Sequence, residues 1–189
     1  MKVPRLTLVL GGGRSGKSRY AESLAESICR DPAKRVYLAT AEPCDEEMRR
    51  RIAEHRKGRE SRFVTLEEPL RLGAALRQLP SGTRVVLLDC VTVWLGNLFF
   101  HLPHEAERAA EVADLLEVLE SPPVDMVLVS NEIGMGVIPA DPQVRAFRDM
   151  AGWLNQDLAA RAARVVLMVA GIPVRIKGRL PRLQREVQL

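Results

Sequence analysis

The sequence predicts one α/β domain in which helices cover both faces of a mostly parallel β-sheet. Short apolar runs without polar alternation are typical of strands that are buried on both faces, and segments with helical periodicity alternate with these runs. A glycine-rich turn joins the first apolar run to the first helical segment. A chain of 189 residues suits a single domain of this kind. We place the domain at residues 1–178 and a charged tail at residues 179–189.

The glycine-rich turn has the pattern Gly-x-x-x-x-Gly-Lys-Ser at residues 11–18, directly after the apolar run 6–10. This pattern is a P-loop, in which backbone N–H groups and the N-terminus of the following helix bind phosphate oxygens. Lys17 is expected to reach the β- and γ-phosphates, and the Ser18 hydroxyl is expected to hold Mg²⁺. A chance match in an ordinary turn is the alternative. It is disfavoured because a strand precedes the motif and a helix follows it.

Two helices and a strand are predicted after the P-loop motif begins. The first helix follows the P-loop, has apolar residues at helical spacing from Ala21 to Ile28, and stops at Asp31-Pro32. The strand covers residues 35–40. The second helix begins after Asp45 and ends at Gly58, and its charges change from acidic to basic along its length, as the helix dipole favours. Within this helix, His55 lies at helical spacing from two apolar residues and is therefore expected on the inward face.

The next apolar run, residues 84–89, ends in an acidic residue, Asp89. A strand over residues 62–66 and a helix from Glu67 to about residue 79 are predicted before it. An acid at the carboxyl end of a strand behind a P-loop indicates the Walker B arrangement, in which the carboxylate holds the metal directly or through water. The pattern alone is weak, because buried strands often end in Asp. The preceding P-loop favours the Walker B interpretation.

The C-terminal half continues the alternation of strands and helices. The predicted elements are helices over 91–101, 104–119 and 142–163, strands over 124–130 and 164–169, and an edge strand over 171–177. The glycine-punctuated loop 131–139 follows a strand at the sheet edge where ligands bind in open α/β folds. Glu132 in this loop acts as a base or metal partner, or else caps a turn. His101 and His104 are interpreted as surface histidines.

Composition excludes several classes of function. The net charge of +4 is modest, acidic residues are interleaved with basic ones, and aromatic residues make up 4%, so a nucleic-acid partner is not expected. The three cysteines, Cys29, Cys44 and Cys90, lack the spacing of a disulfide framework or zinc site. No apolar segment approaches the ~20 residues that span a bilayer. We expect a soluble cytoplasmic protein with an anionic small-molecule ligand.

Several segments are more specific in combination than the P-loop alone. They are residues 11–18, 39–40, 45–48, 51–59, 87–90, 97–98, 130–136 and 155–156. On these segments, nearly the whole chain resembles the bifunctional adenosylcobinamide kinase / adenosylcobinamide-phosphate guanylyltransferase family of cobalamin biosynthesis. The resemblance implies a RecA-like P-loop NTPase fold and a homotrimer. In such a trimer, the apolar stretches 91–100 and 131–139 are expected to be covered by neighbouring subunits.

The resemblance also implies two reactions. A nucleoside triphosphate, ATP or GTP, first phosphorylates the aminopropanol hydroxyl of adenosylcobinamide. GTP then gives its guanylyl group, through a guanylylated histidine, to the phosphate of adenosylcobinamide phosphate, and pyrophosphate leaves. By the motif match, the catalytic histidine is His55. The residues that contact the corrinoid are not transferred by these motifs.

The same resemblance implies the nucleotide and metal contacts. Ser18 and Asp89 would hold Mg²⁺. The nucleotide contacts would come from Gly11, Gly12, Gly13, Arg14, Ser15, Gly16, Lys17, Ser18, Ala39, Thr40, Ala41, Arg56, Lys57, Gly58, Arg59, Glu67 and Asp89. Two positions depart from the pattern of the family. Gly13 replaces the usual Ala, and Glu54 stands where some members have a second His.

Histidine chemistry fits the proposed role of His55. An imidazole must be neutral to attack phosphorus, and an unperturbed pKa near ~6.5 leaves it mostly neutral in the cell. From spacing alone, a partly buried helix histidine without a catalytic role is favoured, and the family resemblance reverses this preference. Two other hypotheses leave His55 unused. They are a simple small-molecule kinase and a regulatory P-loop ATPase that acts through partner binding.

Overall fold

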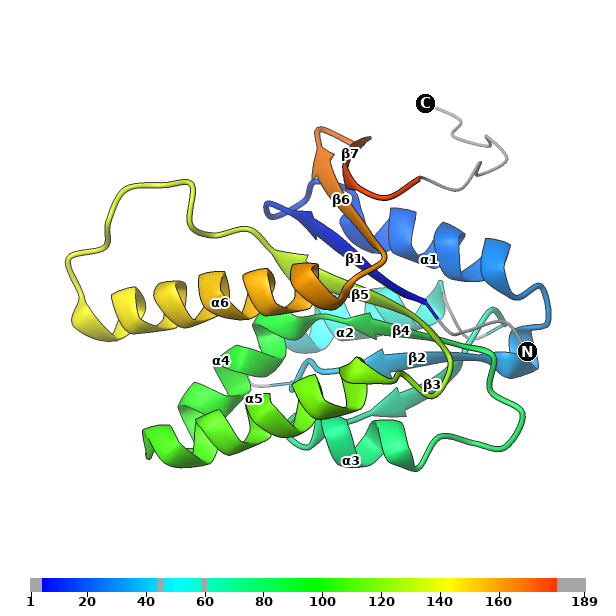
Figure 1. Ribbon diagram of the computed structural model, residues 1–189, viewed down its shortest axis with the longest axis horizontal. Coiled ribbons are helices and arrows are strands. Elements are labelled where there is room, and N and C mark those ends of the chain that lie inside the picture. The colour runs from blue at the N-terminus through cyan, green and yellow to red at the C-terminus, as the bar shows by residue number, and fades with distance from the viewer. Residues whose placement is uncertain (1–4, 44–45, 59–60, 180–189) are drawn as a thin grey trace.

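The computed structural model describes residues 5–43, 46–58 and 61–179, and these form a seven-stranded sheet with helices on its two faces (Figure 1). The strand order is β3-β2-β4-β5-β1-β6-β7. All neighbouring pairs are parallel except β6 and β7, which are antiparallel. The strands are β1 (Leu6–Gly11), β2 (Arg35–Ala39), β3 (Val64–Glu67), β4 (Val85–Asp89), β5 (Asp125–Asn131), β6 (Arg164–Val169) and β7 (Ile172–Lys177).

The helices form two layers around this sheet (Figure 1). Residues of α3, α4, α5 and α6 pack into one hydrophobic cluster on one face, and α1 packs into a second cluster on the other face. The helices are α1 (Lys17–Ile28), α2 (Glu46–Lys57), α3 (Leu72–Arg77), α4 (Val91–His101), α5 (Glu105–Glu120) and α6 (Pro142–Arg161), with a short 3₁₀ helix, η1 (Pro32–Lys34). The prediction of an α/β fold with helices on both faces is confirmed.

The side chains of the central strands alternate between these two clusters. Leu8, Leu88 and Leu128 belong to the cluster that contains Trp94, whereas Val9 and Val129 belong to the cluster under α1. Both sets are buried, so the strands are apolar on both faces, as their uninterrupted apolar sequences predicted. The alternation matters for the site, because it decides which residues at the strand ends point toward the helix that begins at the P-loop.

The strand order confirms the RecA-like arrangement. Strand β5 lies between β1, which leads into the P-loop, and β4, which ends in Asp89. The edge strand β7 is also confirmed, and Pro173 lies within it where one side of the strand has no neighbour. No helix in the described part of the chain is long and apolar enough to cross a membrane.

Two sequence predictions need correction. Helix α3 begins at Leu72 rather than at Glu67, because Glu67 ends β3 and the Glu68 carboxylate accepts hydrogen bonds from the Leu70 and Arg71 N–H groups at 2.8 Å each. These hydrogen bonds form a turn around the Glu68 side chain, and the helix begins only after this turn. Helix α4 was expected to be an exposed apolar surface, but its own chain buries most of it, and Phe100 is its one large hydrophobic side chain that is mostly exposed.

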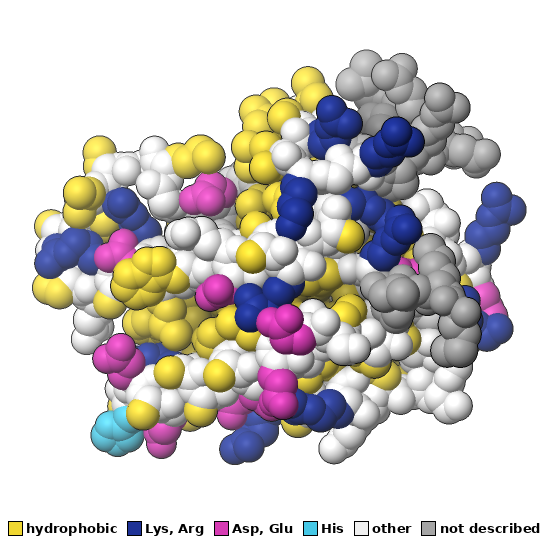
Figure 2. Space-filling view, viewed as in Figure 1, with side chains coloured by type: hydrophobic (Ala, Val, Ile, Leu, Met, Phe, Trp, Pro, Cys, Tyr) yellow, Lys and Arg dark blue, Asp and Glu magenta, His cyan; other side chains and the backbone are white. Residues whose placement is uncertain are grey.

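Apolar side chains are also exposed in the loop between β5 and α6 and on β7. Met135, Val137 and Ile138 are 73–92% exposed in the loop between β5 and α6. Ile172 and Val174 of β7 are also exposed. Figure 2 shows hydrophobic side chains over both regions, at the left above α6 and at the top over β6 and β7. The predicted charged tail, from residue 180 on, lies outside the described residues.

Candidate functional site

The P-loop connects β1 to α1, and its first glycine, Gly11, is tightly packed. A Cβ atom at Gly11 would lie 2.5 Å from Ser15 Oγ and 2.8 Å from the Met168 carbonyl oxygen, so no side chain fits there. Gly16 has φ 88°, in the left-handed region that glycine tolerates. No atom lies within 4 Å of the Cβ position at Gly13. The glycine that replaces the usual Ala at this position is therefore harmless to the shape of the loop.

Lys17 is the first residue of α1 and is 8% exposed. Its Nζ donates a hydrogen bond to the Gly12 carbonyl oxygen at 2.8 Å. Burial lowers the pKa of Lys17 from its usual value, and the nearby groups of Cys90 and Asp89 act in the opposite direction. The structure therefore holds this amine inside the loop, where a phosphate oxygen can replace the carbonyl as its partner.

Asp89 ends β4 on the same face of the sheet as α1. This follows from the strand alternation, because Val85 and Leu87 of β4 pack in the cluster under α1. The Tyr37 hydroxyl donates a hydrogen bond to Asp89 Oδ2 at 2.8 Å, and the Tyr37 ring is buried against Phe63 with ring centroids 5.8 Å apart. One oxygen of the carboxylate is thus oriented by a buried tyrosine on the neighbouring strand.

The donors predicted for a metal are chemically suitable for Mg²⁺. A hydroxyl and a carboxylate, from Ser18 and Asp89, are hard oxygen ligands, and Mg²⁺ at nucleotide sites normally takes only one or two protein ligands beside phosphates and waters. The described residues contain no cluster of three His, Cys, Asp or Glu side chains that could hold a metal by themselves.

Thr40 connects the carboxyl ends of β2 and β4. Its side chain is fully buried, and Oγ1 accepts a hydrogen bond from the Cys90 N–H and donates one to the Cys90 carbonyl, both at 2.9 Å. Asn97 Nδ2 donates to the Thr40 carbonyl at 2.7 Å and to the Pro69 carbonyl at 3.1 Å. Burial raises the pKa of Cys90 to about 12, so this residue stays a thiol. The hydrogen bonds of Thr40 and Asn97 therefore fix the backbone at the carboxyl ends of β2 and β4. A nucleotide contact by Thr40 stays a prediction.

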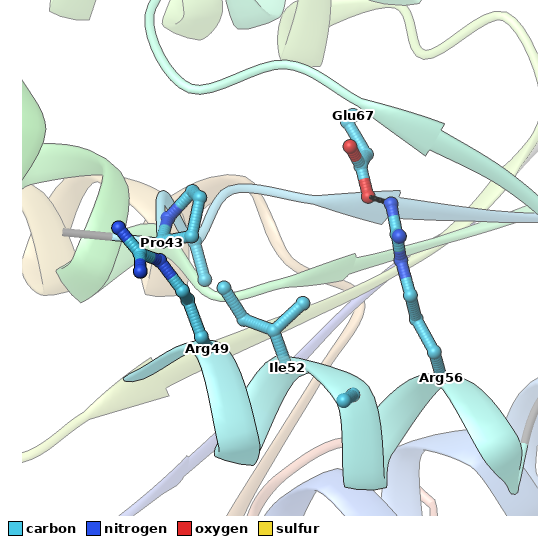
Figure 3. A pocket seen from close by; sticks show the side chains of 7 residues that line it. Pro43, Arg49, Ile52, Arg56 and Glu67 are labelled. Carbon is cyan, nitrogen blue, oxygen red and sulfur yellow. Dashed lines mark hydrogen bonds and ion pairs between the residues drawn. The ribbon is translucent and has the colours of Figure 1, made fainter. Parts of the chain in front are cut away.

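A hollow of about 240 Å³ lies between α2 and the ends of β2 and β3 (Figure 3). The ion pair between Arg56 and Glu67 crosses it, and Ala41 also lines it. The structure therefore brings together three of the predicted nucleotide contacts. The complete lining is Ala41, Pro43, Arg49, Ile52, Ala53, Arg56 and Glu67.

The sequence analysis missed Arg49 and Ile52 as lining residues. Figure 3 shows both side chains on the same side of α2 as Arg56. The signal was present in the spacing, because positions 49, 52, 53 and 56 follow the i, i+3, i+4, i+7 pattern of one helix face. These four positions combine charged and apolar residues, so the sequence analysis did not recognise them as one helix face.

His55 lies in the last turns of α2, three residues after Ile52 and one before Arg56. Its side chain lies outside the described part of the structure, as does that of Lys57, and so does the whole of Arg59. The expectation that His55 faces inward therefore stays a prediction. Gly58 follows the helix, and its carbonyl accepts a hydrogen bond from Arg62 Nε at 2.9 Å.

The structure places three other polar residues that the sequence analysis considered. Glu132 Oε1 accepts a hydrogen bond from the Gly134 N–H at 2.8 Å, so the structure shows the turn-capping arrangement of the two that the sequence left open. His101 Nε2 lies 2.7 Å from Glu42 Oε2 at the end of α4. His104 occupies the N-cap position of α5 and is exposed.

Comparison with known proteins gives consistent matches. Residues 7–176 match the family model of cobinamide kinase / cobinamide phosphate guanyltransferase. The bifunctional adenosylcobalamin biosynthesis protein CobP of Pseudomonas aeruginosa is 48% identical over 172 residues, which cover 90% of this chain and 96% of that protein. The corresponding protein CobU of Escherichia coli is 41% identical over 184 residues, which cover 91% of this chain and 99% of that protein.

A solved structure also overlaps with this fold. The flagellar accessory protein FlaH from Methanocaldococcus jannaschii has a TM-score of 0.49 at 11% sequence identity, over 94% of this chain and 80% of that chain. A likeness of this size is too low to bear on function.

Proposed function

The chain belongs to the cobinamide kinase / cobinamide phosphate guanyltransferase family. From this premise we propose which of its residues take part in each of the two reactions. The chain is an enzyme of adenosylcobalamin biosynthesis that phosphorylates cobinamide and transfers a guanylyl group to the product. The observation that carries the proposal is the placement of two cationic regions at the same edge of the sheet. Lys17 belongs to the P-loop and begins α1, and Arg56 lies on α2 beside the end of β2.

The kinase reaction is proposed for the P-loop. ATP or GTP would bind with its phosphates against the backbone of residues 11–18, and Lys17 would bind the β- and γ-phosphate oxygens. Ser18 and Asp89 would hold Mg²⁺, which when bound neutralises charge on the phosphates. The hydroxyl of adenosylcobinamide then forms the new bond to the γ-phosphorus, and the nucleoside diphosphate leaves with the electron pair of the broken bond.

The guanylyl transfer is proposed for α2. A ring nitrogen of His55 would attack the α-phosphorus of GTP, and pyrophosphate would leave with the electron pair of the broken P–O bond. A phosphate oxygen of adenosylcobinamide phosphate would then attack the same phosphorus and release His55. The guanidinium of Arg56, beside the hollow, would stabilise negative charge on the phosphates during both steps. Ala41 and Glu67 line the same hollow and would contact the nucleotide.

The assembly and location are also proposals. We expect a homotrimer, as the family resemblance implies, and the exposed side chains of Met135, Val137 and Ile138 offer an apolar surface that a neighbouring subunit can cover. Light scattering that gives the monomer mass at micromolar concentration would contradict this expectation. ATP and GTP are abundant in the cytoplasm, which fits the expected cytoplasmic location of the enzyme.

Labelled GTP tests the histidine step. Incubation with Mg²⁺ and α-³²P-GTP should leave label on the protein, and that label should be stable in base and lost in acid, as a phosphoramidate is. Label at the γ-position should not be retained. The variant His55→Asn should lose the α-label and guanylyl transfer, because it lacks the nucleophilic nitrogen, while phosphorylation of adenosylcobinamide persists.

His104→Asn is the matched control, because His104 is an exposed histidine at the start of α5. It should keep the α-label at the level of the unaltered enzyme. Retention of the label by His55→Asn would remove His55 from the mechanism. An unaltered enzyme that phosphorylates the substrate but never takes up α-label would support the simple kinase hypothesis instead.

A further inference from the structure

Asn131 is the last residue of β5, and its backbone is held from two sides. It lies opposite Gly11 in the register of β5 with β1, where the P-loop begins. Its N–H donates a hydrogen bond to Thr92 Oγ1 at 2.7 Å, and its carbonyl accepts one from Asn155 Nδ2 at 3.1 Å. Helices α4 and α6 therefore fix this residue at the phosphate-binding edge of the sheet.

The residues that hold Asn131 form a buried polar network. Ser130 Oγ donates to Asn155 Oδ1 at 2.7 Å and lies 3.0 Å from Thr92 Oγ1. Thr92, Ser130 and Asn155 are each less than 8% exposed. Buried polar groups are costly unless they are paired, and a fully paired network fixes a single geometry. Here the network fixes the backbone position of Asn131.

The side chain of Asn131 points to the face of the sheet that carries α1. Ser130 contacts α4 and α6 on the opposite face, and successive residues of a strand alternate. Val127 and Val129 precede Asn131 on the α1 face and pack in the cluster there. Asp89 is paired with Val129 in the register and lies on the same face. Asn131 and Asp89 thus line the same end of the same face, on neighbouring strands.

The side-chain oxygen of Asn131 is buried and has no hydrogen-bond partner among the described residues. Ser15 Oγ in the P-loop is in the same state, and it lies 2.5 Å from the position that a Cβ of Gly11 would take. Ser15 thus lies beside Gly11 in the P-loop, and Asn131 lies opposite Gly11 in the register of β5 with β1. Leaving a buried acceptor unpaired costs about 1–3 kcal/mol. A cost of this kind at a ligand edge is explained when the ligand supplies the missing donor.

We propose that Asn131 is a catalytic residue of the kinase reaction, whose side-chain oxygen accepts a hydrogen bond from the hydroxyl of the phosphoryl acceptor. Ionised nucleotide phosphates carry no donor, so they cannot satisfy this oxygen. The acceptor is an alcohol, and its O–H group must come to about 3–3.5 Å from the γ-phosphorus. An amide oxygen is too weak a base to take the proton. It orients the hydroxyl so that an oxygen lone pair faces phosphorus.

The step balances as follows. The hydroxyl oxygen forms a bond to the γ-phosphorus, the bond from that phosphorus to the β–γ bridging oxygen breaks, and the nucleoside diphosphate leaves with the electron pair. The hydroxyl proton passes to solvent water. This inference rests on the proposed placement of phosphoryl transfer at the P-loop. Glu132, the neighbouring candidate for a polar role, is instead bonded to the Gly134 N–H.

Asn131→Leu tests the inference, because leucine has a similar size and no acceptor. We expect kcat/KM for adenosylcobinamide to fall about 100-fold, the size seen when one positioned hydrogen-bond group is removed. The Kd of a fluorescent GTP analogue and the α-³²P label on the protein should change less than twofold, since neither involves the acceptor hydroxyl. Asn131→Thr, which keeps an oxygen and suits a strand, should recover at least tenfold of the loss.

Ser130→Ala is the matched control, because it weakens the network behind Asn131 and leaves the Asn131 side chain unchanged. It should lower the melting temperature, and its kcat/KM for adenosylcobinamide should fall much less than the about 100-fold loss expected for Asn131→Leu. If Asn131→Leu does not fold, Asn131→Ala removes the same oxygen and adds no bulk. The same fall in kcat/KM for adenosylcobinamide is expected for this variant.

Three results would overturn the inference. Unchanged kinase kinetics in a folded Asn131→Leu would show that the oxygen does not contact the acceptor. An equal loss of nucleotide affinity would show that the amide contacts the nucleotide instead. A selective loss of apparent Mg²⁺ affinity would show that it contacts a metal-bound water. A failure of the proposed function would give a different result from these three. The unaltered enzyme itself would then fail to phosphorylate adenosylcobinamide or to take up α-label.

Discussion

Two regions of the candidate site, the P-loop edge and the α2 side, are stabilised by different kinds of interaction. At the P-loop edge, Lys17, Tyr37 and Thr40 are each less than 9% exposed, and their polar atoms bond to backbone groups or to Asp89. On the α2 side, Arg56 and Glu67 are each 51% exposed and form an ion pair with one another. The first region is built from buried hydrogen bonds and the second from surface charges.

This difference shows which part of the site is fixed by folding. Buried hydrogen bonds are costly to break, because the groups left behind lose their partners. Exposed ion pairs contribute about 0–1 kcal/mol and weaken with salt. The phosphate-binding edge is therefore set before any nucleotide arrives. The side chains of α2 can exchange their partners for a ligand at little cost.

Lys17→Ala should have the largest effect. Removal of the buried amine should lower the rate of phosphoryl transfer about 100- to 1,000-fold, because the loop would lose the charge that is expected to contact the β- and γ-phosphates. Fluorescent-nucleotide binding and product formation should be measured together. Arg14→Ala, also in the loop but exposed, is the control and should cost far less. Near-normal turnover by Lys17→Ala would show that the edge is not the phosphate site.

Tyr37→Phe should have an intermediate effect. The variant keeps the ring against Phe63 and removes the hydroxyl that donates a hydrogen bond to Asp89. We expect the Mg²⁺ concentration for half-maximal kinase rate to rise about 10-fold, since hydrogen bonds to charged groups contribute about 1.5–3 kcal/mol. Binding of Mn²⁺ in the presence of nucleotide, followed by electron paramagnetic resonance, should weaken in parallel.

The control for this change is Tyr20→Phe, which removes a hydroxyl from α1. The double variant Tyr37→Phe with Asp89→Asn sharpens the test, because Tyr37 acts through Asp89. The tyrosine change should have little further effect once the carboxylate is gone. Fully additive losses would mean that Tyr37 affects the site by another route.

Glu67→Gln should have the smallest effect on the fold. Breaking a half-exposed ion pair should change the free energy of unfolding by less than about 1 kcal/mol, measured by urea denaturation at low and high salt. The loss should shrink as salt rises. A loss of several kcal/mol would mean that the α2 side is held as firmly as the P-loop edge, and the contrast between the two regions would fail.

Local patterns predicted the P-loop edge well. The glycines, Lys17 and Ser18 lie within one strand–turn–helix unit, and Asp89 ends an apolar strand, so short segments of sequence contain the whole signal. The apolar segment that forms α4 was also predicted to be helical at its observed bounds, Val91–His101. The start of α3 was predicted wrongly, because the Glu68 side chain competes with the helix for backbone N–H groups.

The sequence by itself therefore determined the fold class, the phosphate-binding loop and the acidic strand end, because each follows from neighbouring residues. Only the tertiary structure decided the partners of those residues. Tyr37 and Asp89 are 52 positions apart, and Asn131 is held by Thr92 and Asn155, which lie 39 positions before and 24 positions after it. Such contacts depend on strand order, with β5 between β1 and β4. Strand order is set by packing of the whole core, and no short segment of the chain encodes it.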